Sequence, residues 1–287
     1  MRNTANAIEL QHVNCSFGDF AISDLSFSLP SGCILGLVGE NGAGKSTTLR
    51  LIMNTQRRDG GQISVLGVDN TAPEFRQVKE DIGVVLDEAY FPEVLSVREL
   101  KTVLKNTYRN WEPETFQSYL ERFELPERKA FKNFSRGMRM KLAIAAALSH
   151  RPRLLLLDEA TAGLDPMVRD EILTVFAEFT RSEDHSILIC SHIVSDLEKL
   201  CDYVAFLHRG KLQFWEEKDR LIESFGLWSC TPEQLTELDP ASVAGREDSP
   251  YGVRALLRRD LVPDGLELER PSLEDIILLQ VKGEKRK

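Results

Sequence analysis

The sequence lacks any long apolar run. Its longest stretch of consecutive apolar residues, Leu142 to Leu148, has seven members, whereas a membrane-spanning helix needs about 20. The N-terminus has no basic stretch followed by an apolar core, so we expect no secretory signal. These absences predict a chain that stays in the cytosol and reaches a membrane only by binding a protein within it.

Cysteine is also scarce, and negative charge exceeds positive charge. The five cysteines are scattered, and no C-x-x-C pair or Cys/His cluster suggests zinc. A disulfide framework is not expected in a chain of 287 residues, so we interpret the cysteines as buried small apolar residues. The net charge of −9 argues against a chain-wide surface for nucleic acid, and no nucleic-acid partner is expected.

Short apolar segments alternate with helical stretches along most of the chain. The expected strands are Cys33–Val38, Ile82–Leu86, Leu154–Leu157, Ser186–Cys190 and Tyr203–Leu207. The helices expected near them include Lys45–Met53, Asp165–Arg181 and Ile193–Leu200. Such alternation predicts an α/β core built on a parallel sheet with crossover helices.

Two segments depart from this alternation. From about Glu88 to His150 the pattern indicates successive helices, expected at Val97–Lys105, Pro113–Phe123 and Ser135–Ser149. We therefore expect a helical subdomain, at about 88–150, inserted into a domain that spans 1–225. Residues 226–287 are expected to form a small C-terminal α+β accessory domain, with strands at Val253–Arg258 and Leu266–Leu268 and a helix over Leu273–Val281.

A glycine-rich loop lies between the first apolar strand and the helix that begins at Lys45. It fits G-x-x-x-x-G-K-[ST], in which backbone N–H groups and a helix N-terminus bind phosphate. Lys45 would reach the β- and γ-phosphates of ATP, and the Ser46 hydroxyl would bind Mg²⁺. The expected nucleotide-binding residues here are Gly39, Glu40, Asn41, Gly42, Ala43, Gly44, Lys45, Ser46 and Thr47.

A second acidic motif ends the strand that begins at Leu154. Asp158 would hold Mg²⁺ through water, because the C-terminal ends of strands in an α/β sheet face the ligand crevice. Glu159 follows directly and could deprotonate the attacking water. A core strand ending in a solvated acidic pair would be the simpler interpretation if the phosphate loop were absent.

The order of further motifs resembles the ATP-binding cassette (ABC) family, over roughly Ile8 to Phe225. Asn133-Phe134-Ser135-Arg136-Gly137-Met138 is similar to the family's signature motif. The stretch from Asp158 to Pro166 is similar to its Walker B and D-loop, and Cys190-Ser191-His192 is similar to its switch-histidine segment. Phe17 stands where the family has an aromatic that stacks on adenine, although core packing is an alternative for this residue.

This resemblance implies a P-loop NTPase core with an N-terminal antiparallel β subdomain, the inserted helical subdomain and the C-terminal appendage. It implies an ATPase that binds ATP and Mg²⁺ and pairs with a second copy of itself in an ATP-sandwich dimer. Ser135 and Gly137 would bind the nucleotide held by the other copy, and His192 would donate a hydrogen bond to the γ-phosphate. The ATPase would drive a separate integral membrane permease from the cytoplasmic face of the cell membrane.

Two departures from the family pattern affect these expectations. Asp87 stands where the family usually has a Gln, and a carboxylate there could bind Mg²⁺. The alternative is that Asp87 faces solvent, with Glu88 or water completing the metal shell. Arg136 replaces the first glycine of the signature, giving an S-[KR]-G-M form similar to that of bacterial export cassettes, which favours export over import.

Two other functions compete with transport. One is an ABC ATPase of translation or DNA repair, but such proteins carry tandem cassettes or a long coiled-coil insertion, and this sequence has one cassette and no heptad run. The other is a nucleotide-switch regulatory protein that does not hydrolyse ATP. Against it, Lys45, Asp158, Glu159 and His192 are all present.

Overall fold

The computed structural model describes residues 6–18, 20–87, 91–263 and 265–284. The chain divides into two compact units. The first contains Met1–Ile193 and Ala205–Trp215, and the second contains Val194–Val204 and Glu216–Lys287. Within the described part of the chain, no helix combines the length and apolar character needed to cross a membrane.

A six-stranded sheet, in the order β10-β9-β3-β8-β7-β6, forms the core of the first unit. Its strands are β3 (Ile34–Val38), β6 (Ile82–Val85), β7 (Leu154–Asp158), β8 (Ser186–Ser191), β9 (Tyr203–His208) and β10 (Lys211–Glu217). The β6–β7, β7–β8 and β8–β3 pairs are parallel. Every residue of β3, β7 and β8 is buried, which explains why these strands read as continuous apolar runs.

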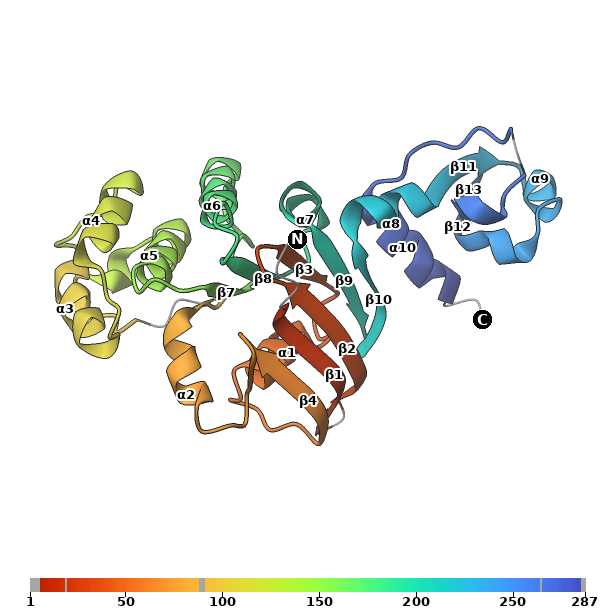
Figure 1. The fold of residues 1–287 in the computed structure, drawn as a ribbon. Helices are drawn as coiled ribbons and strands as arrows, with labels where there is room; N and C mark the ends of the chain where they lie inside the picture. The colour runs from red at the N-terminus through yellow and green to blue at the C-terminus, as the bar shows by residue number, and fades with distance from the viewer. Residues whose placement is uncertain (1–5, 19, 88–90, 264, 285–287) are drawn as a thin grey trace. The chain divides into compact units, whose positions relative to one another are not determined.

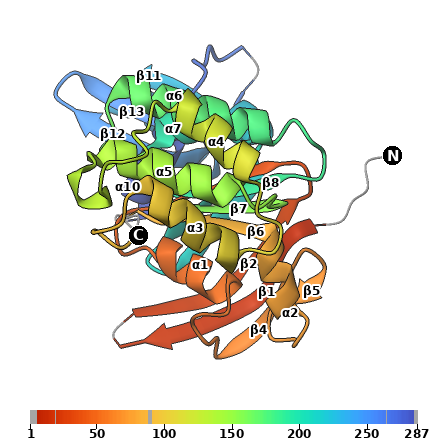
Figure 2. The ribbon, with the colours of Figure 1, turned by 90° about the vertical axis from the view of Figure 1, so that its left-hand side faces the viewer.

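A second sheet of the first unit is antiparallel, in the order β2-β1-β4-β5 (Figure 2). Its strands are β1 (Asn6–Phe17), β2 (Phe20–Pro30), β4 (Gly60–Val65) and β5 (Val68–Asp69). Buried and more exposed residues alternate along much of β2, as expected where one face of a sheet packs on a core. The expected parallel sheet and N-terminal antiparallel sheet are thus confirmed.

Three helices between β6 and β7 form a group of their own (Figure 1): α3 (Val97–Thr107), α4 (Pro113–Arg122) and α5 (Arg136–Leu148). Ser96 caps α3 in a capping box with Glu99, and Ser135 caps α5. Helix α5 packs on β6, where Gly83 leaves little room for a side chain, since an added Cβ would lie 2.6 Å from Leu155 Cδ2 and 3.1 Å from the Ala147 oxygen. The expected helical insertion is confirmed, although its expected first residue, Glu88, lies outside the described residues.

The remaining helices of the first unit are α1 (Lys45–Ile52), α2 (Phe75–Val78) and α6 (Pro166–Phe179).

All five cysteines are free, but only three are fully buried. Cys33 and Cys230 are half-buried because each lies at the end of a strand rather than within the core. The expectation of five buried cysteines was therefore wrong for these two.

The second unit has a three-stranded antiparallel sheet in the order β11-β13-β12. Its strands are β11 (Phe225–Cys230), β12 (Val243–Ser249) and β13 (Gly252–Arg258), and its helices are α7 (Val194–Leu200), α8 (Lys218–Ser224), α9 (Pro232–Thr236) and α10 (Leu273–Glu284). Helices α7 and α8 contact α10, so this unit includes residues before 226.

The strand expected at Leu266–Leu268 is wrong. These residues have no strand conformation, and their apolar side chains instead pack on the cluster around Leu235, Val253 and Leu257. Leu268 lies so close to Gly226 that an added Cβ there would meet its Cδ1 at 2.5 Å. The apolar pattern therefore reflects coverage of the small core, not pairing in a sheet.

A tight turn between β9 and β10 holds the loop that precedes α1. The N–H of Gly210 donates to the Ala43 oxygen at 3.0 Å, and the Gly210 oxygen accepts from the Ser23 N–H at 3.0 Å. Gly210 has φ +75°, and a Cβ added there would lie 1.8 Å from the Ala21 oxygen. Only glycine can occupy this position without moving the backbone.

We expect Gly210→Ala to lower the free energy of unfolding by about 3 kcal/mol, because left-handed strain adds to a backbone clash. The matched control is Gly67→Ala, with φ +82° but no heavy atom within 4 Å of the added Cβ. It carries the strain alone and should lose about 1 kcal/mol. Urea unfolding measures both, and equal losses would contradict the clash at Gly210.

Candidate functional site

The glycine-rich loop curls between the end of β3 and the start of α1. Gly44 has φ +114°, and a Cβ there would lie 2.9 Å from Cζ of Phe20. A Cβ on Gly39 would lie 2.5 Å from the Leu207 oxygen. By contrast, Gly42, with φ +81°, has no heavy atom within 4 Å of the Cβ position, and Glu40 and Asn41 are exposed. The loop is fixed on its inner side and open on its outer side, as a phosphate cradle requires.

The Lys45 side chain runs back along this loop and is buried, with 6% of its surface exposed. Its Nζ donates to the Gly39 oxygen at 2.7 Å and to the Glu40 oxygen at 3.3 Å, and lies 3.2 Å from Glu159 Oε1. A buried ammonium group is costly unless it is paired. The carboxylate of Glu159 therefore compensates the positive charge of Lys45.

Glu159 also binds His192, the first residue after β8. His192 Nδ1 lies 2.7 Å from Glu159 Oε2, and the carboxylate can only accept, so Nδ1 carries the proton. Glu159 has a left-handed backbone, with φ +51°, and its N–H donates to the Cys190 oxygen at 2.9 Å. Such a conformation costs about 1–2 kcal/mol, which surrounding contacts must offset. The two candidate catalytic residues are thus brought together.

Asp158 ends β7 as a buried carboxylate with an unpaired oxygen, Oδ1. Burial raises the pKa of Asp158, the Ser46 hydroxyl lowers it, and the charges of Glu159 and Asp87 raise it further. A cation bound there would stabilise the ionised form, so the two residues fit a metal site. No group of three or more His, Cys, Asp or Glu side chains suited to a metal was found among the described residues. That agrees with Mg²⁺, which is usually held by one or two protein groups together with phosphates and water.

A cleft of about 700 Å³ runs beside this metal site. Its lining joins α1, β6 and β7 and comprises Ser46, Leu49, Arg50, Met53, Thr55, Val84, Leu86, Asp87, Leu156 and Asp158. Asp87 thus lies at the same cleft as Asp158 and Ser46, although Arg136 Nη2 donates to its Oδ1 at 2.8 Å.

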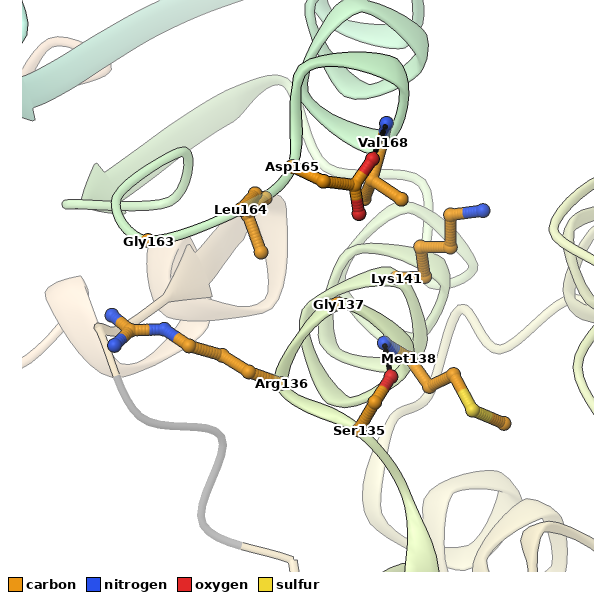
Figure 3. A pocket seen from close by; sticks show the side chains of 9 residues that line it. All are labelled: Ser135, Arg136, Gly137, Met138, Lys141, Gly163, Leu164, Asp165 and Val168. Atoms are coloured by element: carbon orange, nitrogen blue, oxygen red, sulfur yellow. Dashed lines mark hydrogen bonds between the residues drawn. The ribbon is translucent and has the colours of Figure 1, made fainter.

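Ser135 and Gly137 lie at the N-terminus of α5, beside a second cleft of about 360 Å³ (Figure 3). The Ser135 oxygen accepts from the Met138 N–H at 3.3 Å, which leaves the hydroxyl proton for another acceptor. A Cβ on Gly137 would make only ordinary contacts with Val168, so nothing in its own chain requires glycine there. These two residues are not part of the group formed by Lys45, Glu159 and His192.

Phe17 and Thr47 are the remaining residues predicted to bind the nucleotide. Phe17 is at the end of β1 with 70% of its surface exposed, so core packing does not account for it. Thr47 is half-buried in the first turn of α1.

Sequence reasoning missed Gly210 as a residue that supports the site. A glycine between two apolar segments indicates a turn, but nothing local reveals that this turn binds Ala43, 167 positions earlier. A contact between residues so far apart in the sequence can be identified only from the structure.

Comparisons with known proteins agree with this geometry. The family model for the ABC transporter matches residues 22–162. The ABC transporter ATP-binding protein YtrB of Bacillus subtilis (strain 168) is 31% identical over 76% of this chain and 74% of its own length. Nod factor export ATP-binding protein I of Rhizobium sp. (strain N33) is 33% identical over 95% and 96%, respectively. A solved ATP-binding subunit of an ABC transporter aligns with a TM-score of 0.69 at 25% identity, covering 76% of this chain and 92% of that one.

The two relatives match over most of their own length and of this chain, and the residues matched by the family model include the glycine-rich loop, Asp158 and Glu159. The chain therefore belongs to the ABC transporter family and is one of its ATP-binding, ATP-hydrolysing subunits.

Proposed function

We propose that the group around Lys45 is the ATPase site and that it powers export through a separate membrane permease. The observation that carries the proposal is the chain of short contacts from the buried Lys45 ammonium through the Glu159 carboxylate to the ring of the exposed His192, beside the glycine-rich loop. In this proposal residues 39–47 bind the phosphates of ATP, and the exposed ring of Phe17 stacks on the adenine.

Lys45 changes partner when ATP binds. Its ammonium group leaves Glu159 for the β- and γ-phosphates, which carry more negative charge than one carboxylate. Of its two side-chain contacts, with Lys45 and with His192, Glu159 then keeps the one with His192. Its released oxygen, Oε1, accepts a proton from the attacking water as the water's oxygen bonds to the γ-phosphorus and the bond to the β-phosphate oxygen breaks.

His192 can serve the γ-phosphate in one of two ways. A neutral ring whose Nδ1–H donates to Glu159 has only an acceptor at Nε2. To donate to phosphate, the ring must either accept a second proton or turn Nδ1–H away from Glu159. We propose the second route, because the γ-phosphate carries more negative charge than the Glu159 carboxylate and therefore attracts the Nδ1–H donor more strongly.

Mg²⁺ would be held by Ser46 and Asp158, with Asp87 as a further carboxylate, and would supply charge stabilisation at the phosphates. Arg136 occupies one oxygen of Asp87, Oδ1, which leaves Oδ2 for a second partner.

The site is completed by a second copy of the chain. ABC ATP-binding subunits form dimers, and the proposed arrangement is a head-to-tail homodimer that encloses two ATP molecules. Ser135 would offer its hydroxyl proton, and Gly137 its N–H and its lack of a side chain, to the γ-phosphate held by the other copy. A close approach from outside the chain explains a glycine that the chain itself does not require.

ABC ATP-binding subunits also work with membrane permeases. The proposed docking surface for the permease is formed by the helices of residues 88–135 and the cleft beside β6, where Leu86, Val94 and Val103 are exposed apolar side chains. The S-R-G-M form of the signature and the likeness to a Nod factor export protein support export. The protein would then be cytoplasmic, at the inner face of the cell membrane, with residues 1–225 as the nucleotide-binding domain and 226–287 as an accessory domain.

We expect Glu159→Gln to keep ATP binding but to slow hydrolysis by a factor on the order of 10² to 10⁴, because the variant cannot accept the proton from water. Phosphate release from saturating ATP measures the rate. The control is Glu178→Gln, which removes a carboxylate paired with Arg122 far along α6 and should leave the rate unchanged. Wild-type turnover in Glu159→Gln would remove this residue from the mechanism.

Lys45→Ala should abolish measurable nucleotide binding or turnover while the fold persists, since the variant loses the one ammonium group inside the loop. Calorimetry with ATP and circular dichroism test the two parts of this expectation. Lys105→Ala removes an exposed lysine of α3 and serves as the charge-matched control. Normal affinity together with normal turnover in Lys45→Ala would contradict the proposed phosphate loop.

A photo-crosslinking residue in place of Val103 should capture an integral membrane protein in native membranes, because an exposed apolar side chain on α3 belongs to the proposed permease surface. The same residue in place of Gln62, exposed on the antiparallel sheet, should not. Mass spectrometry identifies the product. Capture of only ribosomal or DNA-repair proteins at position 103 would favour the non-transport branch of the family.

A further inference from the structure

Two charged residues that both depart from the family pattern are in contact. Arg136 Nη2 donates to Asp87 Oδ1 at 2.8 Å, joining the first residue of α5 to the loop after β6. Figure 3 shows the Arg136 side chain extending away from Met138 and Lys141, which lie on the other side of the helix start. The guanidinium group is therefore directed toward its own chain's loop at residue 87.

Arg136 also lies beside the turn that follows Glu159. A Cβ added to Gly163, which has φ +67°, would lie 3.1 Å from both Cζ and Nη1 of Arg136. The guanidinium group is thus located between two loops, one carrying Asp87 and one following the candidate base. A side chain that pairs with one loop and lies beside the other is held in place more firmly than a long side chain in free solution.

The charge of Asp87 lies at the cleft of the proposed metal site. Asp87, Asp158 and Ser46 line the same cleft. An uncompensated carboxylate at position 87 would therefore repel the phosphates of ATP, which carry several negative charges.

We propose that Arg136 is a positioning residue for ATP binding: it holds the Asp87 carboxylate and neutralises its charge beside the phosphate site. The pair replaces two neutral residues of the family pattern with two opposite charges, so the net charge at this place is preserved. The inference rests on the proposed nucleotide site. Both side chains are about half exposed, 52% for Arg136 and 53% for Asp87, so the pair contributes little to folding stability and its main effect is on the site.

The test measures ATP affinity by calorimetry with EDTA present, so that metal binding by Asp87 does not enter. The central comparison has four proteins, namely wild type, Arg136→Ala, Asp87→Asn and the double variant, and two further variants serve as controls. We expect Arg136→Ala to weaken ATP binding roughly tenfold, the effect of one uncompensated charge near a surface site. Asp87→Asn leaves the Arg136 charge unopposed beside the phosphates and should bind ATP more tightly than wild type, whereas the double variant, which is neutral at both positions, should bind within about twofold of wild type. Arg136→Lys should retain most of the affinity, because it keeps the charge.

A double variant that binds ATP as weakly as Arg136→Ala would overturn the proposal, since the loss of affinity would then not come from an uncompensated Asp87 carboxylate. Unchanged affinity in Arg136→Ala would also overturn it. The control is Arg122→Ala, which breaks a comparable ion pair with Glu178 in the same unit and should not alter ATP binding. Failure of the wild-type protein itself to bind ATP would instead contradict the proposed function, and the inference with it.

Discussion

A buried ammonium group that must always have an anionic partner is the constraint on which the rest of the site depends. Lys45 Nζ lies among the oxygens of Gly39, Glu40 and Glu159, with almost none of its side chain exposed. Removing an unpaired ammonium from water costs several kcal/mol. The chain therefore keeps Glu159 beside Lys45, and under the proposed mechanism the phosphates of ATP release that carboxylate by taking its place.

The parallel sheet brings these groups together. β3, β7 and β8 are neighbours, and their C-terminal ends carry the glycine loop, Asp158 with Glu159, and His192. Parallel neighbours end at the same edge, so residues about 150 positions apart meet without any local signal. The left-handed backbone of Glu159 then turns its side chain back toward both Lys45 and His192. The Cys190 oxygen accepts a hydrogen bond from the Glu159 N–H, and the Gly210 N–H donates one to the Ala43 oxygen. These two bonds hold the loop after β7 and the glycine-rich loop against the sheet.

Much of the first unit was predictable because its signals are local. The start of α3 follows from the capping box of Ser96 and Glu99, and the start of α4 follows from Pro113 at its first position. The buried strands follow from continuous apolar runs. The second unit was less predictable, because an apolar segment can cover a core this small either as a strand or as a loop. Leu266 and Leu268 cover it from a loop, whereas the polar segment Val243–Ser249 forms a strand.

The site shows the same division between local and distant information. Its motifs gave the residues and their order, but not their partners. The pairing of Asp87 with Arg136, 49 positions apart, depends on how α5 packs on β6. The tautomer of His192 depends on its distance from Glu159. Neither fact is written in the residues next to these positions.

The claim that Lys45 exchanges Glu159 for the phosphates of ATP is tested most directly by ATP affinity in the absence of metal. Calorimetric titration of ATP, with EDTA present, would compare the wild-type protein with Glu159→Gln. If the exchange occurs, binding must break an ion pair in the wild-type protein but not in the variant, so the variant should bind ATP several-fold more tightly. Equal or weaker binding by the variant would contradict the exchange.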